Sequence, residues 1–153
     1  MTDPTASSPL LHELIMTHAF EVPPQSVFEA WSRAEHVAQW FTPAPLTTPE
    51  CEVDLCDGGV FRVVMEMPDG TRHPMEARFT EVVPNERIVF TAIIEVDLDI
   101  KTTVTLAPHD GGTLLTMRQV YGRESASTQG AEAGWTQTLK QLATHMAASA
   151  EAG

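Results

Sequence analysis

The spacing of apolar and polar residues changes along the chain, and its central part alternates with a period of two. The segment "ECEVDL" at residues 50–55 is an example, and the alternation continues almost to Tyr121. This period predicts β-strands, and the turn sequences "CDGG", "PDG", "PNE" and "PHDGG" interrupt it at hairpin-like intervals. Because the connections are short, we expect antiparallel pairing. The predicted strands are 49–56, 59–67, 72–83, 86–96, 99–107 and 112–121.

The segment before this region predicts one strand and the start of a helix. The apolar and β-branched stretch at residues 11–22 is unevenly spaced for an amphipathic helix and is interpreted as a strand. A proline pair follows, and proline is well tolerated in the first turn of a helix. The apolar residues that share one face of this helix are Val27, Phe28 and Trp31.

A second short helix is expected directly after the first. Ser32 and Glu35 form an S-x-x-E pattern, which predicts a capping box and therefore a new helix start. Val37, Trp40 and Phe41 then recur at helical spacing. We interpret the tryptophans of both helices as scaffold residues that pack against the sheet, and we expect Phe41 at the mouth of any cavity.

The last segment, residues 126–150, predicts a long helix with one apolar face. Trp135, Leu139, Leu142 and Met146 form a continuous stripe at spacings of three and four residues. The remaining positions are largely polar, as in a helix that lies on a sheet.

Length and charge limit the possible functions. A chain of 153 residues with 42% hydrophobic residues is sufficient for one domain, which we place at residues 10–150 after a loose tail at residues 1–9. The formal charge of -12 disfavours nucleic acids and anionic membranes as partners. The first residues show no signal-peptide pattern and no membrane span, so we expect a cytoplasmic protein.

The two cysteines predict free thiols. Cys51 and Cys56 are five positions apart, and strand alternation directs them to opposite faces, where they cannot form a disulfide with each other. Free thiols are typical of a reducing compartment.

The order of elements, with five sequence motifs, resembles a known superfamily. The motifs are "VPPQSVFEAWSRAEHVAQWF", "DLCDGGVFRVVMEMPDG", "EVVPNERIVFT", "DGGTLLTMRQVYG" and "GWTQTLKQLATHM". They resemble the START-like or birch-pollen-allergen-like superfamily (SRPBCC), and within it the branch named after the activator of the 90-kDa heat-shock protein ATPase. The resemblance implies an α+β helix-grip fold, in which a seven-stranded curled antiparallel sheet wraps around a long C-terminal helix, with two short helices after the first strand.

The resemblance also implies a cavity between the sheet and the C-terminal helix. Superfamily members hold lipids, polyketides or aromatic molecules there, and some catalyse cyclisation or hydrolysis. The co-chaperone that names the branch binds its chaperone through a separate N-terminal domain, for which this chain has no room. A chaperone partner is therefore retained only as an alternative, and a second copy of the chain is also left open as a partner.

Strand parity and the apolar stripe of the last helix indicate which residues would line this cavity. Methionines are frequent among them, and methionine adapts to ligands of different shape. The alternative is that the same residues simply fill a core. The predicted lining comprises Phe41, Phe61, Val63, Met65, Met67, Met75, Phe79, Phe90, Ile94, Trp135, Leu139 and Leu142.

The sequence contains no recognisable catalytic, metal-binding or nucleotide-binding motif, so we expect no metal and no cofactor. The primary hypothesis is a protein that binds a small hydrophobic molecule. The alternative is an enzyme that uses a pocket His73, Glu66 or Glu95, which requires at least one of these side chains to point inward beside Phe61 or Met65.

Overall fold

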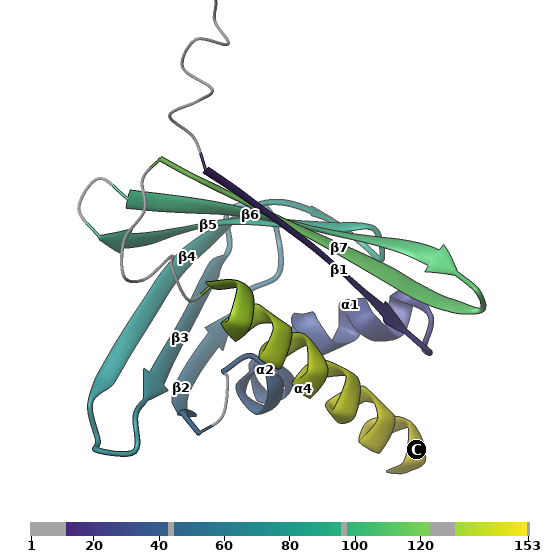
Figure 1. Cartoon of the computed structure of the whole chain (residues 1–153), viewed down its shortest axis with the longest axis horizontal. Coiled ribbons are helices and arrows are strands. Elements are labelled where there is room, and N and C mark those ends of the chain that lie inside the picture. The colour runs from purple at the N-terminus through teal and green to yellow at the C-terminus, as the bar shows by residue number, and fades with distance from the viewer. Residues whose placement is uncertain (1–11, 43–44, 96–97, 123–130, 153) are drawn as a thin grey trace, which may run out of the picture.

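The central feature of the structure is one antiparallel sheet. The computed structural model describes residues 12–42, 45–95, 98–122 and 131–152. Within this part of the chain the sheet has seven strands in the order β1-β7-β6-β5-β4-β3-β2 (Figure 1). Strands β2 to β7 each pair with the next strand in the sequence, whereas β1 pairs with β7. Every neighbouring pair is antiparallel. The predicted fold class is confirmed.

The bounds of the elements agree with the predicted ones to within a few residues. The strands are β1 (His12–Phe20), β2 (Thr47–Val53), β3 (Val60–Glu66), β4 (Arg72–Val83), β5 (Arg87–Glu95), β6 (Leu98–His109) and β7 (Gly112–Tyr121). The helices are α1 (Pro24–Ser32), α2 (Ala34–Trp40) and α4 (Ala131–Ala152). The predicted tail at residues 1–9 and the predicted start of the last helix at residue 126 lie outside the described residues.

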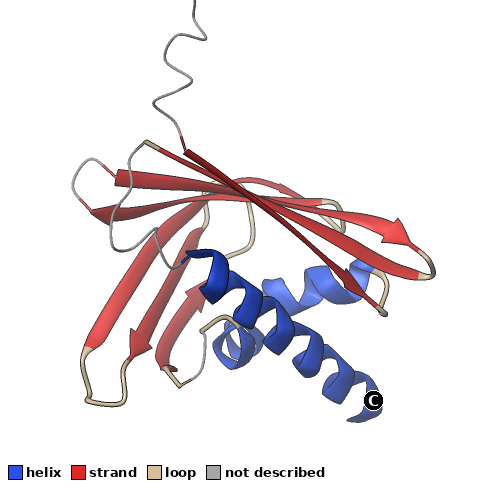
Figure 2. Cartoon of the chain, viewed as in Figure 1, coloured by secondary structure: helices blue, strands red, loops and turns tan. Residues whose placement is uncertain are grey.

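The described helices all lie on the concave side of the sheet (Figure 2). Register shifts occur between β2 and β3, between β4 and β5, and between β5 and β6. Such irregularities bend strands and increase their twist, which accounts for the curl of the sheet around α4. None of the described helices combines the length and the apolar composition that crossing a membrane requires.

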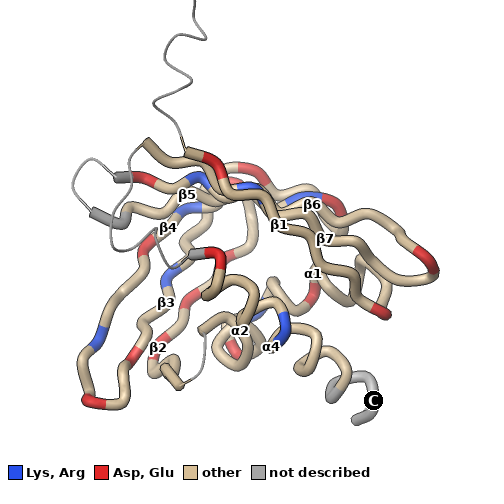
Figure 3. Tube along the Cα trace, viewed as in Figure 1, with Lys and Arg blue, Asp and Glu red and all other residues tan. Residues whose placement is uncertain are grey.

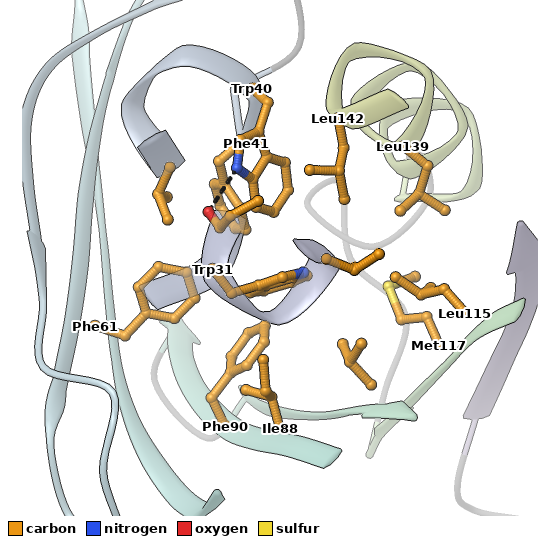
Figure 4. Close-up of a cluster of buried hydrophobic side chains, with 14 of the residues drawn as sticks. Trp31, Trp40, Phe41, Phe61, Ile88, Phe90, Leu115, Met117, Leu139 and Leu142 are labelled. Carbon is orange, nitrogen blue, oxygen red and sulfur yellow. Dashed lines mark hydrogen bonds between the residues drawn. The ribbon is translucent and has the colours of Figure 1, made fainter. Parts of the chain in front are cut away.

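Trp31 lies at the centre of the hydrophobic core (Figure 4). Its ring contacts Phe61 and Phe90 of the sheet at centroid distances of 6.5 and 6.2 Å. Leu139 and Leu142 of α4 close the core from the other side. The tryptophans of the short helices are therefore scaffold residues, as the sequence predicts.

The corner between the two short helices differs from the prediction. Ser32 ends α1, and its hydroxyl donates back to the carbonyl of Glu29 at 2.7 Å instead of capping α2. Arg33 is the N-cap of α2 and makes no side-chain cap hydrogen bond. The capping-box interpretation is wrong because the extended backbone of Arg33 separates two complete helices. Ser32 satisfies the carbonyl end of α1, not the N–H end of α2.

The β6–β7 turn brings the start of β7 against the end of β1. Gly112 lies so close that an added Cβ would be 2.0 Å from the carbonyl oxygen of Phe20, so only glycine fits this position. The hydroxyl of Thr113 donates to the carbonyl of Val22 at 2.7 Å. These contacts fix the point where the chain leaves the sheet and enters α1.

Strands β2, β3 and β4 carry charges that pair across the sheet, with acidic residues on β2 and both signs on β3 and β4 (Figure 3). Arg62 interacts with Glu50 and Glu76, while Arg72 interacts with Glu50 and Glu66. These side chains are substantially exposed, and such pairs contribute little to stability. The carboxylate of Glu66 is thereby directed toward Arg72 on the outer face, away from the helices.

Both cysteines are free thiols. Cys51 is half-buried in β2, and Cys56 is exposed in the turn after it. Burial raises the pKa of the Cys51 thiol to about 11, which suppresses its reactive thiolate form at neutral pH.

Candidate functional site

A cleft of about 610 Å³ lies between the N-terminal end of α4 and the concave face of the sheet. The sheet contributes apolar side chains from β3 to β6, and α4 contributes Gly134, Trp135 and Thr138. Phe41 and Leu46, from the segment between α2 and β2, complete the wall. The lining residues from the sheet are Met65, His73, Pro74, Met75, Phe90, Ala92, Ile93, Ile100, Thr102 and Gln119.

Five of the residues that the sequence indicates for a cavity line this cleft. They come from five separate parts of the chain, which the fold brings to one end of α4. They are Phe41, Met65, Met75, Phe90 and Trp135.

Five other predicted residues do not line the cleft, because they are buried in the core. Phe61 and Phe79 stack on each other with ring centroids 5.0 Å apart, and Trp31 packs against Phe61. Val63, Leu139 and Leu142 are also buried in this core. Beneath the middle of α4 these side chains pack against the sheet, and the cleft lies toward the N-terminal end of the helix.

Of the last two predicted lining residues, Met67 does not line the cleft. Met67 follows β3 toward the β3–β4 turn and is 37% exposed. The side chain of Ile94 lies outside the described residues.

The polar part of the lining was not among the predicted residues. Thr102 and Gln119 occupy inward positions of β6 and β7, directly opposite each other in the register. Their neighbours on the same face, Val104 and Met117, are fully buried. Two polar residues within an apolar row were a signal in the sequence, but only the strand register shows that they form a pair.

The pair is buried and incompletely satisfied. Gln119 Nε2 donates to Thr102 Oγ1 at 3.0 Å. Gln119 Oε1 is buried and finds no hydrogen-bond partner among the described residues. The cleft thus contains a buried polar pair in a mainly apolar wall.

Hydrogen bonds to backbone carbonyls hold the helix side of the cleft in place. Thr138 Oγ1 donates to the carbonyl of Phe41 at 3.2 Å. Gln141 Nε2 donates to the carbonyls of Trp40 and Thr42 at 3.0 and 2.8 Å. These bonds join α4 to the segment that carries Phe41, so two sides of the cleft form one rigid wall.

Among the described lining residues, His73 alone is ionisable. It lies opposite Met65 in the β3–β4 register and is exposed at the rim. Glu66 pairs with Arg72 on the outer face at 2.8 Å, and the side chain of Glu95 lies outside the described residues. In the part of the chain that the structure describes, no three side chains are grouped to hold a metal ion. The arrangement offers apolar contact and neutral hydrogen bonding.

Comparison with known proteins gives a family and a shared fold. A model of the family described as Activator of Hsp90 ATPase homolog 1-like protein matches residues 21–147. A search of curated proteins finds no match for this chain.

Solved structures of bacterial proteins share the fold over most of their length. A crystal structure from Rhodobacter sphaeroides has a TM-score of 0.82 at 21% identity, covering 89% of this chain and 93% of that one. A protein from Chromobacterium violaceum has a TM-score of 0.79 at 28% identity, with coverages of 86% and 94%. The AHSA1 protein from Silicibacter pomeroyi has a TM-score of 0.75 at 24% identity, with coverages of 90% and 99%.

Proposed function

Because the chain belongs to the Activator of Hsp90 ATPase homolog 1-like protein family and has an apolar cleft beside α4, we propose that it binds a small hydrophobic molecule there. The cleft is the observation that carries this proposal. Its volume of about 610 Å³ lies within the range of about 300–1,000 Å³ that is usual for small-molecule sites.

The residues proposed to contact the ligand are those that the sequence predicts for the cavity and that also line the cleft. Met65 and Met75 provide flexible, polarizable side chains, which adapt to ligands of different shape. Phe41, Phe90 and Trp135 provide aromatic surfaces. In this proposal the buried residues around Phe61 serve as the rigid support of the site.

We include a cytoplasmic location in the proposal because both cysteines are free thiols. A chaperone partner is supported only by the name of the family, and no contact surface in the described residues favours it.

The proposal is tested by blocking the cleft. An added Cβ at Gly134 would meet no atom within 4 Å, and leucine is a better helix former than glycine. We expect Gly134→Leu to fold normally and to weaken binding of the neutral dye N-phenyl-1-naphthylamine by about tenfold or more, because the leucine occupies part of the cleft. Fluorescence titration measures this affinity, and native mass spectrometry of the purified protein detects a copurified ligand.

The matched control is Ala133→Leu, which places the same side chain on an exposed position of the same helical turn. This variant should bind the dye like the wild type. Equal affinities for Gly134→Leu and the wild type would contradict the proposal, as would absence of both dye binding and a copurified ligand.

A second candidate function is an acid–base reaction on the bound molecule. The observation that favours it is His73, which lines the cleft opposite Met65, as the enzyme hypothesis requires. In this case His73→Asn should retain dye binding and abolish turnover of a small aromatic ester, followed by absorbance. Wild-type protein that binds the ester without accelerating its hydrolysis would exclude His73-assisted hydrolysis of this substrate.

A further inference from the structure

The polar pair of the cleft, Thr102 and Gln119, is almost completely buried. The two residues are 1% and 6% exposed, and they sit on adjacent strands at paired positions. The hydrogen bond between them uses one end of the Gln119 amide and leaves Oε1 without a partner among the described residues.

Such a pair reduces the stability of the fold. A buried acceptor without a partner has lost its hydrogen bonds to water and forms none with the protein in their place. Apolar side chains fill three of the four adjacent positions of the same parity, namely Ile100 and Val104 on β6 and Met117 on β7, and Tyr121 occupies the fourth. The surrounding environment would therefore accept an apolar residue at either position, so packing alone does not explain the pair.

The charge of the lining limits what the pair can recognise. Among the described residues that line the cleft there is no lysine, arginine, aspartate or glutamate, and His73 is exposed at the rim. The chain as a whole carries a formal charge of -12. A carboxylate placed beside Gln119 would thus be desolvated without a counter-charge, which is strongly unfavourable.

We propose that Gln119 and Thr102 form a neutral polar anchor, which selects an apolar ligand that carries one uncharged hydroxyl group, such as an alcohol or a phenol. This inference rests on the proposed function and specifies the ligand class. A hydroxyl both donates and accepts, so it can pair with the free Oε1 of Gln119. It can pair equally well with Nε2 if the amide adopts the opposite orientation.

The experiment compares three probes of similar size: 2-naphthol, naphthalene and 2-naphthoate. Their affinities are measured at pH 7, where the phenol is protonated and the acid is ionised, by quenching of tryptophan fluorescence. We expect wild-type protein to bind 2-naphthol about fivefold to tenfold more tightly than naphthalene, and 2-naphthoate at least about tenfold more weakly than 2-naphthol.

Two variants remove the anchor without removing the cleft. Gln119→Leu and Thr102→Val should each reduce the preference for 2-naphthol over naphthalene to about twofold or less, with the affinity for naphthalene retained. Thr103→Val is the matched control, because Thr103 is the next residue of β6 and has the opposite strand parity. It should keep the wild-type preference. Thermal unfolding verifies that each variant is folded, and Thr102→Val carries the test if Gln119→Leu is not.

The outcomes separate the anchor from the proposed function. If naphthalene binds and the hydroxyl gives no advantage in the wild type, the anchor is refuted while hydrophobic binding stands. If a folded Gln119→Leu protein loses all three probes equally, the pair has only a structural role, and the anchor is again refuted. If no probe binds to the wild type, both the anchor and the proposed function fall.

Discussion

Trp31 and Trp40 occupy the same core but use their indole N–H groups differently. Their rings meet edge to face at a centroid distance of 4.8 Å, and both side chains are almost completely buried. Trp40 Nε1 donates to the carbonyl of Ala30 at 3.0 Å, whereas Trp31 Nε1 has no partner among the described residues. Ala30 lies in the last turn of α1, where carbonyls lack intrahelical partners, so Trp40 caps this helix from α2.

We expect Trp40→Phe to destabilise the protein more than Trp31→Phe, by about 1–3 kcal/mol. Both substitutions remove similar indole volume from the core. Only Trp40→Phe breaks a buried hydrogen bond, while Trp31→Phe also removes an unsatisfied donor. Urea unfolding followed by circular dichroism gives the two free energies, and equal losses would show that the bond to Ala30 contributes nothing.

Single residues also mark the limit of what the sequence predicts. Strand parity correctly placed Met65, Met75 and Phe90 on the inner face, because one-sided burial imposes a period of two. Parity cannot separate a residue of the core from a residue of the cleft. That difference depends on where Trp31 fills the space, and Trp31 reaches Phe61 only through the packing of α1.

At the scale of elements, α2 and α4 meet through two histidines. His36 Nδ1 and His145 Nε2 are 3.0 Å apart, a distance at which one ring donates and the other accepts. The pKa of His145 lies below its ordinary value because burial disfavours the charged ring, and the nearby His36 adds to the effect. The pKa of His18 on β1 is lowered as well, first by burial and then by Lys140 of α4.

These lowered pKa values predict that stability decreases in mild acid. Below about pH 6.5 the unfolded chain takes up protons at these positions before the folded chain does, so acid favours unfolding. Above that pH both states are neutral there, and the effect disappears. We expect the free energy of unfolding to fall between pH 7.5 and pH 5.5, as measured by urea denaturation at both values.

His145→Gln should reduce this pH dependence without abolishing it, since His18 contributes in the same direction. His109→Gln is the control, because His109 is the exposed last residue of β6. An undiminished slope in His145→Gln would show that the α2–α4 contact does not sense pH.

The elements themselves were largely predictable from local patterns. The alternation of apolar residues and the turn sequences predicted the six strands from β2 to β7, because each signal lies within a few neighbouring residues, and β1 was predicted from an apolar, β-branched stretch. The start of α2 was misjudged, since Ser32 matches a capping pattern and only the packing of Trp40 on Ala30 reveals that α1 continues to Ser32.

At the scale of the whole molecule, a packed core and a cleft lie beside different parts of α4 on the concave side of the sheet. Beneath the middle of α4, Leu139 and Leu142 meet the aromatic cluster around Trp31 and leave no cleft. Beside the first turns of α4, Gly134 and Thr138 are small, and the space opposite them persists. The sequence predicted Trp135, Leu139 and Leu142 as the helix side of the cavity. Trp135 lines the cleft, whereas Leu139 and Leu142 are buried in the core.

The attachment of α4 to the segment after α2 limits the routes by which a small molecule could enter or leave the cleft. Thr138 and Gln141 of α4 donate hydrogen bonds to the carbonyls of residues 40–42. These bonds would have to break together before α4 could separate from that segment and open the cleft there. The opposite side, at His73 and Pro74, is exposed. In the proposed binding function, a ligand would therefore enter and leave past the exposed β3–β4 hairpin.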